Sequence, residues 1–230
     1  MPGEICLAHN GVLFLDELPE FSRSVLETLR QPLEDRVITI SRAKYTFTLP
    51  CSFMLVASMN PCPCGWHHHP THQCTCTPAQ IQRYMGKISG PLMDRIDIQV
   101  EVESVPFEDM ARAPKGESSA VIRERVVRAR KIQEERYSSL PVGEGGGRGR
   151  FHCNAQMNTA MLQKYAALDD ASLHRLRDAM RRLNLSARAY DRILKVARTI
   201  ADLEASETIQ SHHIAEAIGY RNLDREGWLE

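Results

Sequence analysis

The chain has no excess of charge of either sign, because 29 lysine and arginine residues balance 29 aspartate and glutamate residues. A zero net charge argues against a polycation whose whole surface binds phosphate backbones, so any contact with DNA has to be local. No apolar run is long enough to cross a bilayer, and residues 1–4 lack the basic and then apolar pattern of a secretory signal. We therefore expect no membrane association and a cytoplasmic location.

The cysteines do not form an even set that would suit a disulfide framework. There are seven of them, and four crowd into one short segment. This pattern favours reduced thiols or a metal site. The remaining composition, 43% hydrophobic and 25% charged over 230 residues, is typical of a globular chain with one large or two modest domains.

An apolar run that ends in two acids is the clearest motif of the chain. Gly11 is followed by Val-Leu-Phe-Leu and then by Asp16 and Glu17, which predicts a buried strand with both carboxylates at its carboxyl end. In open α/β sheets, ligands bind beyond that end of the strands. Asp16 could hold Mg²⁺ through its water shell, and Glu17 could orient an attacking water, as nucleotide hydrolysis requires. A plainer interpretation is that the two acids only cap the next helix.

The residues that follow predict further elements of an α/β unit. A helix begins near Ser24, whose spacing to Glu27 is that of a capping box, and Pro32 ends or kinks it. The first two of four β-prone runs predict a hairpin with a basic tip, and the last two predict further strands. These runs lie at 37–40, 45–49, 53–57 and 96–102.

The second half of the chain has a different pattern. Residues 105–117 are rich in proline, glycine and small residues and predict a linker. Helical periodicity follows, with helices expected at 118–137, 155–167, 171–183, 187–203 and 212–218. The sequence therefore predicts an α/β core with parallel strands over residues 1–104 and a small all-helical domain over residues 118–230.

The order of the motifs resembles the core and lid of AAA+ ATPases. The strand that ends in Asp16 and Glu17 is followed by a strand leading to Asn60, then by residues 90–97, and then by Ser186-Ala187-Arg188 at the start of a helix. This resemblance implies a partial P-loop (AAA+) αβα core followed by a small all-helical lid domain that carries sensor 2.

Within the AAA+ class, three segments resemble the Mg-chelatase-like family and in particular its competence-protein branch. They are residues 11–21, residues 36–43 and, above all, Asn60-Pro61-Cys62-Pro63-Cys64-Gly65. The similarity continues through residues 192–203 and so covers nearly the whole chain.

The resemblance implies roles for five side chains around ATP and Mg²⁺. Asp16 and Glu17 form the Walker B pair, with Asp16 on Mg²⁺ and Glu17 in catalysis. Asn60 is sensor 1, a side-chain amide that orients the water or contacts the γ-phosphate. Arg95 is the arginine finger that reaches a nucleotide held by a neighbouring subunit, and Arg188 is the sensor-2 arginine that contacts the nucleotide. A permanently charged guanidinium suits the charge of the transition state.

Each of the last three residues also has a plain structural interpretation. Asn60 before Pro61 is a good turn residue, and Arg95 between two aspartates could form an ordinary surface ion pair. Arg188 could be a solvated helix arginine.

The same resemblance makes residues 36–49 the hairpin before sensor 1, which in related hexameric motors points into the central pore. Arg42 and Lys44 near its tip would then contact the DNA backbone without reading its sequence. A hexamer turns this weak basic tip into a ring of charge, which reconciles DNA binding with zero net charge. The implied partners are copies of the chain in a hexameric ring and single-stranded or branched DNA.

Four cysteines form two close pairs with histidines between them. Cys62 with Cys64 and Cys74 with Cys76 could hold one structural Zn²⁺ and pin a loop that has little core of its own. Each pair is C-x-C, which is shorter than the usual spacing. Two interpretations therefore stay open: a zinc site, with the histidines as competing ligands, and reduced cysteines in a mobile loop.

No Gly-x-x-x-x-Gly-Lys-[Ser/Thr] loop occurs in the sequence, so the backbone cradle and the lysine that hold the β- and γ-phosphates are absent. In the resembling family this Walker A loop lies upstream of the Walker B strand. We therefore expect the chain to be the C-terminal part of a longer ATPase and to be inactive alone.

Three functions follow from these observations. The leading one is an ATP-hydrolysing hexameric motor that acts on branched DNA, as a helicase or in branch migration during recombination or natural transformation. A second is the ATPase subunit of a Mg chelatase, against which the cysteine loop argues because the chlorophyll-pathway relatives lack it. A third is a truncated, non-catalytic chain that assembles with full-length partners.

Overall fold

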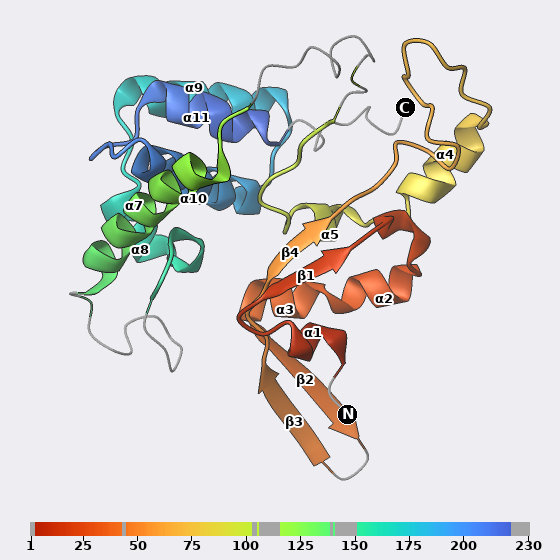
Figure 1. Cartoon of the computed structure of the whole chain (residues 1–230), viewed down its shortest axis with the longest axis horizontal. Helices are drawn as coiled ribbons and strands as arrows, with labels where there is room; N and C mark the ends of the chain where they lie inside the picture. The colour runs from red at the N-terminus through yellow and green to blue at the C-terminus, as the bar shows by residue number, and fades with distance from the viewer. Residues whose placement is uncertain are drawn as a thin grey trace. The chain divides into compact units, whose positions relative to one another are not determined.

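The protein is described by a computed structural model that covers residues 3–42, 45–102, 105, 116–138, 140 and 151–221. The chain divides into two compact units, the first reaching Ile96 and the second starting at Asp97 (Figure 1). Each unit is built around its own elements. Those of the first unit are α1 (Glu4–Leu7), β1 (Val12–Leu15), η1 (Leu18–Glu20), α2 (Arg23–Thr28), α3 (Arg30–Asp35), β2 (Val37–Arg42), β3 (Tyr45–Pro50), β4 (Met54–Ala57), α4 (Pro78–Met85) and α5 (Gly90–Met93).

The first unit contains the predicted parallel strands. β1 pairs with β4 in parallel, with Leu13 opposite Leu55 and Leu15 opposite Ala57. Leu13 and Leu15 join a core with helix residues such as Leu26 of α2, and Figure 1 shows α2 and α3 beside the two strands. This confirms an α/β fold with parallel strands.

The other face of the same strand pair is apolar and exposed in the part of the chain that the structure describes. Strand side chains alternate between the two faces, so the neighbours of the core leucines all point to this second face. Their exposed fractions range from 39% to 59%, and they are Val12, Phe14, Met54 and Val56. Two-sided apolar character is typical of a strand that is buried on both faces.

The first long helix is split at Leu29 into α2 and α3. Pro32 explains the break, because its ring clashes with the carbonyl group four residues earlier and it has no N–H to donate. The predicted N-cap was wrong by two residues: Ser22, rather than Ser24, accepts the hydrogen bond from the Val25 N–H. Glu27 does not complete a capping box and instead binds Arg30 and Ser89.

The predicted hairpin is confirmed by an antiparallel pair, β2 and β3, with Thr39 opposite Thr48. It extends away from the β1–β4 pair (Figure 1). Its base is tied to the rest of the unit, because the Cys51 N–H donates to the Arg36 carbonyl at 2.8 Å and the Cys51 side chain is fully buried. Residues 51–53 alone separate the hairpin from β4.

The strand predicted at residues 96–102 is absent from this part of the described chain, and that prediction was wrong. A strand needs a neighbouring strand for its backbone groups, but here the Gln99 N–H donates to the carbonyl of Tyr220, which follows a helix, at 2.9 Å. Asp97, which begins the second unit, pairs with Arg192 of the same unit. Ile98, Val100 and Val102 remain more than half exposed, at 51%, 61% and 86%.

The described part of the second unit is helical, as its periodicity predicts. Its elements are α7 (Ser119–Ser138), η2 (Asn154–Gln156), α8 (Thr159–Tyr165), α9 (Asp170–Arg182), α10 (Ala187–Leu203) and α11 (Ser211–Gly219). Side chains cap the starts of α9 and α10, where Asp169 and Ser186 accept hydrogen bonds from Ser172 and Ala189. None of the helices formed by the described residues is both long and apolar enough to span a membrane.

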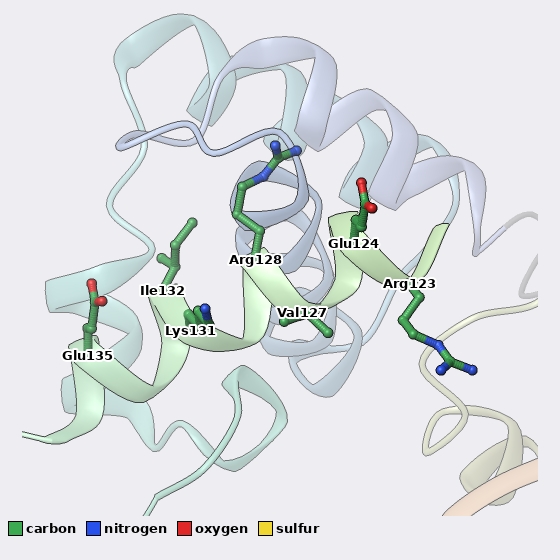
Figure 2. A pocket seen from close by; sticks show the side chains of 7 residues that line it. All are labelled: Arg123, Glu124, Val127, Arg128, Lys131, Ile132 and Glu135. Atoms are coloured by element: carbon green, nitrogen blue, oxygen red, sulfur yellow. The ribbon is translucent and has the colours of Figure 1, made fainter. Parts of the chain in front are cut away.

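Helix α7 carries an open hollow of about 530 Å³ on its surface (Figure 2). One helix alone supplies the lining, which carries charged groups of both signs. The lining residues are Arg123, Glu124, Val127, Arg128, Lys131, Ile132 and Glu135. Such a hollow brings no set of reactive groups together from different elements, and we assign no chemistry to it.

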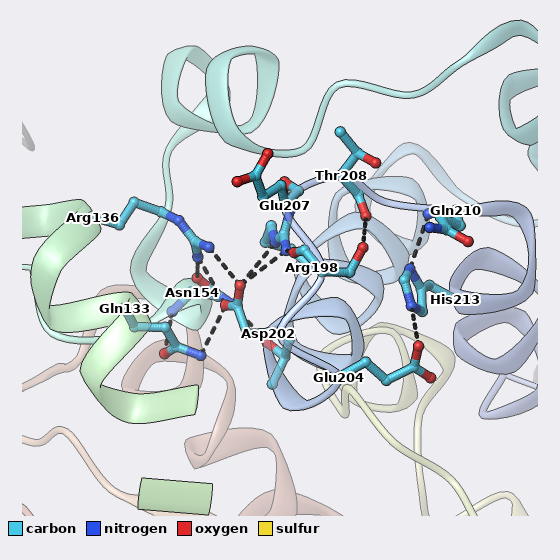
Figure 3. A network of polar contacts seen from close by, with 12 residues as sticks. Gln133, Arg136, Asn154, Arg198, Asp202, Glu204, Glu207, Thr208, Gln210 and His213 are labelled. Atoms are coloured by element: carbon cyan, nitrogen blue, oxygen red, sulfur yellow. Dashed lines mark hydrogen bonds and ion pairs between the residues drawn. The ribbon is translucent and has the colours of Figure 1, made fainter. Parts of the chain in front are cut away.

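A buried polar network joins α7, η2 and α10 inside the second unit (Figure 3). Asp202 is fully buried and accepts hydrogen bonds from Arg136, Arg198, Asn154 and Gln133. Burial alone would raise the pKa of Asp202, but the bonds from Arg136 and Asn154 outweigh it and hold the pKa below its usual value. The network therefore keeps a charged carboxylate inside an apolar core.

Candidate functional site

The candidate site lies where the parallel strands β1 and β4 end. Because the two strands run in the same direction, their carboxyl ends meet at one edge of the sheet. Asp16 and Glu17 follow β1, and Ser58 and Asn60 follow β4. Two backbone bonds hold the ends together: the Ser58 N–H donates to the Leu15 carbonyl at 3.0 Å, and the Leu18 N–H donates to the Ser58 carbonyl at 2.9 Å.

Ser58 connects the two predicted acids. Its hydroxyl donates to Oδ1 of Asp16, and its Oγ accepts from the Glu17 N–H at 3.3 Å. The Glu17 N–H also lies 3.1 Å from Oδ1 of Asp16. Ser58 is a residue of the candidate site that sequence reasoning missed, although its place directly after a buried strand was a usable signal.

The backbone at Glu17 is unusual. Its φ of 51° and ψ of 53° place a non-glycine residue in the left-handed region, where an L-residue loses roughly 1–2 kcal/mol. Strained backbone of this kind gathers at functional sites. Here the turn allows the chain to leave β1 at once, so that both Asp16 and Glu17 are exposed beyond the strand.

Asn60 is exposed, and its backbone contacts a buried tyrosine. Burial raises the pKa of Tyr84, a backbone hydrogen bond from Asn60 opposes this rise, and the charges of Glu20 and Glu17 add to it. Tyr84 belongs to α4, which follows the cysteine segment. The end of β4 is thus held on one side by β1 and on the other by α4.

The predicted arginine finger, Arg95, is buried within the first unit. Its Nε lies 2.8 Å from a carboxylate oxygen of Glu34, and its Nη1 donates to the Pro91 carbonyl at 2.7 Å. The side chain is 8% exposed. Arg95 would have to leave these partners before it could contact a nucleotide on another subunit.

The other predicted site residues lie elsewhere. Arg188 is exposed in the first turn of α10, in the second unit. Arg42 pairs through its backbone with Tyr45 at the end of the hairpin. Lys44 and the side chain of Arg42 lie outside the described residues.

The four predicted metal ligands converge. Their sulfur atoms all lie within 4.8 Å of one another, and the cysteines are not joined by disulfides. Backbone N–H groups of Trp66 and Thr75 lower the pKa of Cys64 to about 5, whereas burial raises that of Cys76 to about 12. No histidine of residues 60–77, all of which are described, belongs to the cluster.

Comparison with known families covers both units. The family described as "Magnesium chelatase, subunit ChlI" matches residues 1–110, and the one described as "Magnesium chelatase, subunit ChlI C-terminal" matches residues 116–221. The two matches meet near the boundary between the core and the helical region.

Among curated proteins, the chain is similar to Competence protein ComM of Haemophilus influenzae, with 47% identity over 97% of this chain and 41% of that protein. It is 44% identical to the uncharacterized protein YifB of Salmonella typhimurium over 97% of the chain and 42% of the relative. An uncharacterized protein of Mycobacterium tuberculosis, Rv2897c, is 38% identical over 96% of the chain and 41% of the relative. The chain thus spans about two fifths of the length of these relatives, and it belongs to the magnesium-chelatase-like family of AAA+ proteins, in the group of Competence protein ComM.

Proposed function

We propose that this chain carries the hydrolytic part of an ATP-driven AAA+ motor that acts on DNA. The observation that supports this most directly is the meeting of Asp16, Glu17, Ser58 and Asn60 at the carboxyl ends of β1 and β4. Two acids, a hydroxyl and an amide at one sheet edge are the groups that nucleotide hydrolysis uses.

Asp16 is the residue that would hold Mg²⁺. Its Oδ1 accepts the two hydrogen bonds found for this carboxylate among the described residues, which leaves Oδ2 for a water of the ion's shell. Mg²⁺ keeps several waters and needs only one or two carboxylates, so one exposed aspartate fits it. When bound, the ion neutralises charge on the β- and γ-phosphates.

Glu17 would orient the attacking water. Its carboxylate is exposed and accepts no hydrogen bond among the described residues, so it remains available as an acceptor. The left-handed backbone places this residue next to Asp16 instead of on the opposite face of a continuing strand. Asn60, at the end of the neighbouring strand, would contribute the amide that contacts the γ-phosphate or the water.

Two arginines would complete the site in an assembled ring. We assign Arg188 to the lid contact with the nucleotide and Arg95 to the contact with a nucleotide on the neighbouring subunit. In this chain Arg95 is paired with Glu34. Its role as a finger therefore requires an exchange of partners on assembly, which makes Glu34 a second residue to vary.

DNA binding is assigned to the hairpin of β2 and β3. Besides Arg42 and Lys44 near the tip, it carries Tyr45 and Phe47, whose rings lie 6.0 Å apart and are 66% and 54% exposed. Exposed aromatic rings offer stacking surfaces for unpaired bases, and basic residues attract the backbone. Single-stranded or branched DNA is the substrate that fits both, and six hairpins in a ring would add their weak contributions.

The test uses a chimera in which this chain replaces the matching region of the H. influenzae relative, so that the rest of that protein supplies any missing phosphate-binding parts. We expect ATP hydrolysis that DNA stimulates and migration of four-way junctions. Glu17→Gln should lower kcat by about 10²-fold or more while ATP binding persists. Glu20→Gln, a nearby exposed acid, is the matched control and should keep its activity. Full activity of Glu17→Gln would overturn the proposal.

A second candidate is the ATPase subunit of a magnesium chelatase, which the description of the matching families favours. The two candidates differ in their response to DNA. An active chimera whose ATPase ignores single-stranded and branched DNA, and whose hairpin variant Tyr45→Ala binds DNA no worse than the parent, would favour the chelatase role. If this chain alone changes the activity of the intact relative on mixing but hydrolyses nothing itself, it acts as a non-catalytic assembly partner.

A further inference from the structure

The segment between β4 and α4 is long and has little regular structure. It runs from Pro61 to Thr77 without a helix or strand. Loops longer than about 12–15 residues without secondary structure are uncommon in compact domains. Among the described residues, two backbone hydrogen bonds form inside this segment: the Gly65 N–H donates to the Cys62 carbonyl, and the His69 N–H donates to the Trp66 carbonyl. Something else must hold such a segment in one conformation.

Four sulfur atoms converge inside this segment. The Sγ atoms of Cys62 and Cys64 lie 3.3 Å apart, those of Cys62 and Cys74 3.8 Å, and those of Cys64 and Cys74 3.6 Å. A disulfide bond would bring two sulfurs to about 2.05 Å. Four thiolates around a tetrahedral Zn²⁺, with bonds of about 2.3 Å, lie about 3.8 Å apart. The observed spacing is therefore that of ligands around a common centre.

We propose that Cys62, Cys64, Cys74 and Cys76 bind one structural Zn²⁺ ion that closes the loop between β4 and α4. The set is complete with four sulfurs, so it leaves no open position for a substrate, as in closed structural sites. Soft thiolate ligands select zinc over Mg²⁺. The inference goes beyond the proposed hydrolysis and does not depend on it.

The neighbouring histidines are engaged with one another instead of with the sulfurs. Nδ1 of His69 accepts from the His72 N–H at 3.1 Å, and the His72 ring stacks on Trp66 with centroids 4.2 Å apart. The rings of His67 and His68 lie 3.8 Å apart. This arrangement settles the ligand set as four cysteines and makes the histidines suitable controls.

The positions of the first and last cysteine indicate which elements the ion would connect. Cys62 follows Asn60 by two residues and is fully buried against Tyr84 and Met85 of α4. Cys76 directly precedes Thr77, which caps α4 in a capping box with Gln80. One ion therefore joins the end of β4 to the start of α4 and fixes the stretch from which Asn60 projects.

The first measurement is the metal content of the 230-residue chain, purified without chelator and desalted to remove loose metal. We expect about one zinc per chain and, after exchange with Co²⁺ alone, the strong visible absorption of tetrahedral cobalt bound to thiolates. Less than about half a zinc per chain, with all four thiols reactive, would overturn the proposal. Stoichiometric iron in place of zinc would overturn the assignment of the metal.

Variants then test the ligand set. Cys74→Ser should lose the zinc, whereas Cys6→Ser and His69→Ala should keep it. Loss of zinc in His69→Ala would overturn the four-cysteine set. If Cys74→Ser does not fold, the cobalt spectrum of the parent chain still counts the thiolate ligands. Removing zinc from the parent should raise hydrogen exchange at residues 58–77 by about tenfold or more and leave α10 unchanged; equal exchange with and without zinc would contradict its role in the loop.

Discussion

The two units use charged side chains in opposite ways. In the second unit, Asp202 is fully buried and surrounded by donors, among them Arg136 and Arg198 (Figure 3). In the first unit, Asp16 and Glu17 stand exposed at a strand end with Ser58 as their side-chain partner. One carboxylate is saturated by the protein and can serve only the fold. The other two keep capacity for a ligand, which is what a site requires.

The units also differ in how completely they cover their apolar surface. The helices of the second unit share one core cluster that reaches from Tyr137 to Ile218. The first unit has two smaller clusters and an exposed apolar sheet face. The described part of the first unit therefore has less shared core to stabilise it, and the proposed zinc ion would add a crosslink in its long loop.

The largest expected effect is in the second unit. Asp202→Ala removes the shared partner of Arg136 and Arg198 and leaves buried cations uncompensated, so it should lower the free energy of unfolding of this unit by about 3–5 kcal/mol. The free energy of unfolding is measured from the hydrogen exchange of α10 amides at increasing urea concentrations. Asp178→Ala, an exposed aspartate beside His174, is the control and should change stability by less than about 0.5 kcal/mol. A loss below about 1 kcal/mol for Asp202→Ala would mean that the network is not a stabilising element.

The two faces of β1 provide the next test. Leu13→Ala leaves a cavity in the core and should lower the free energy of unfolding by about 2–4 kcal/mol. Phe14→Thr, on the exposed face, should lower it by less than about 1 kcal/mol in this chain. Urea unfolding followed through exchange of β1 and β4 amides compares them. In the chimera with the H. influenzae relative, a rise in the cost of Phe14→Thr toward that of Leu13→Ala would show that the remaining protein covers this face.

The pH dependence of stability should also separate the units. The folded pKa of Asp202 is lowered, so its contribution is complete above the unfolded pKa of about 3.9 and is lost as the pH falls through the folded value. The free energy of unfolding of the second unit should therefore fall more steeply below pH 4 in the parent chain than in Asp202→Asn. Parallel pH profiles for the two proteins would contradict this assignment.

The smallest effect is expected at the strained turn of the site. Glu17→Gly relieves a left-handed backbone and should stabilise the first unit by up to about 1 kcal/mol, while it removes the proposed catalytic carboxylate. Glu20→Gly, in η1, relieves no such strain and should destabilise the unit by about 0.5–1 kcal/mol. Destabilisation by both changes would show that the turn at Glu17 is not strained.

Sequence reasoning predicted best where a local signal decides the outcome. The helix expected at 187–203 has those bounds in the structure, because Ser186 caps it and an apolar stripe continues to its end. The cysteine cluster also follows from spacing alone, since two pairs close in sequence can meet across one loop. Strand β1 and its acidic end were found for the same reason.

Sequence reasoning failed where tertiary partners decide. Residues 96–102 alternate like a strand, but alternation cannot reveal whether a neighbouring strand is present to pair with them. Ser22 and Ser24 are equally good caps by composition, and in the structure the first of them caps α2. Ser58 was missed because a serine after a strand is common, and its bond to Asp16 depends on the pairing of β1 with β4.

The base of the hairpin has a mechanical consequence. β2 starts directly after Arg36, a residue with left-handed backbone at the end of α3. β3 is joined to β4 by three residues that include the buried Cys51, so both strands are closely attached to the rest of the unit at the base of the hairpin. A sideways force on the tip would therefore be transmitted into β4, and Ser58 directly follows β4. The Ser58 hydroxyl donates to Asp16, so the hairpin is joined to the acidic pair through one short, ordered stretch of chain.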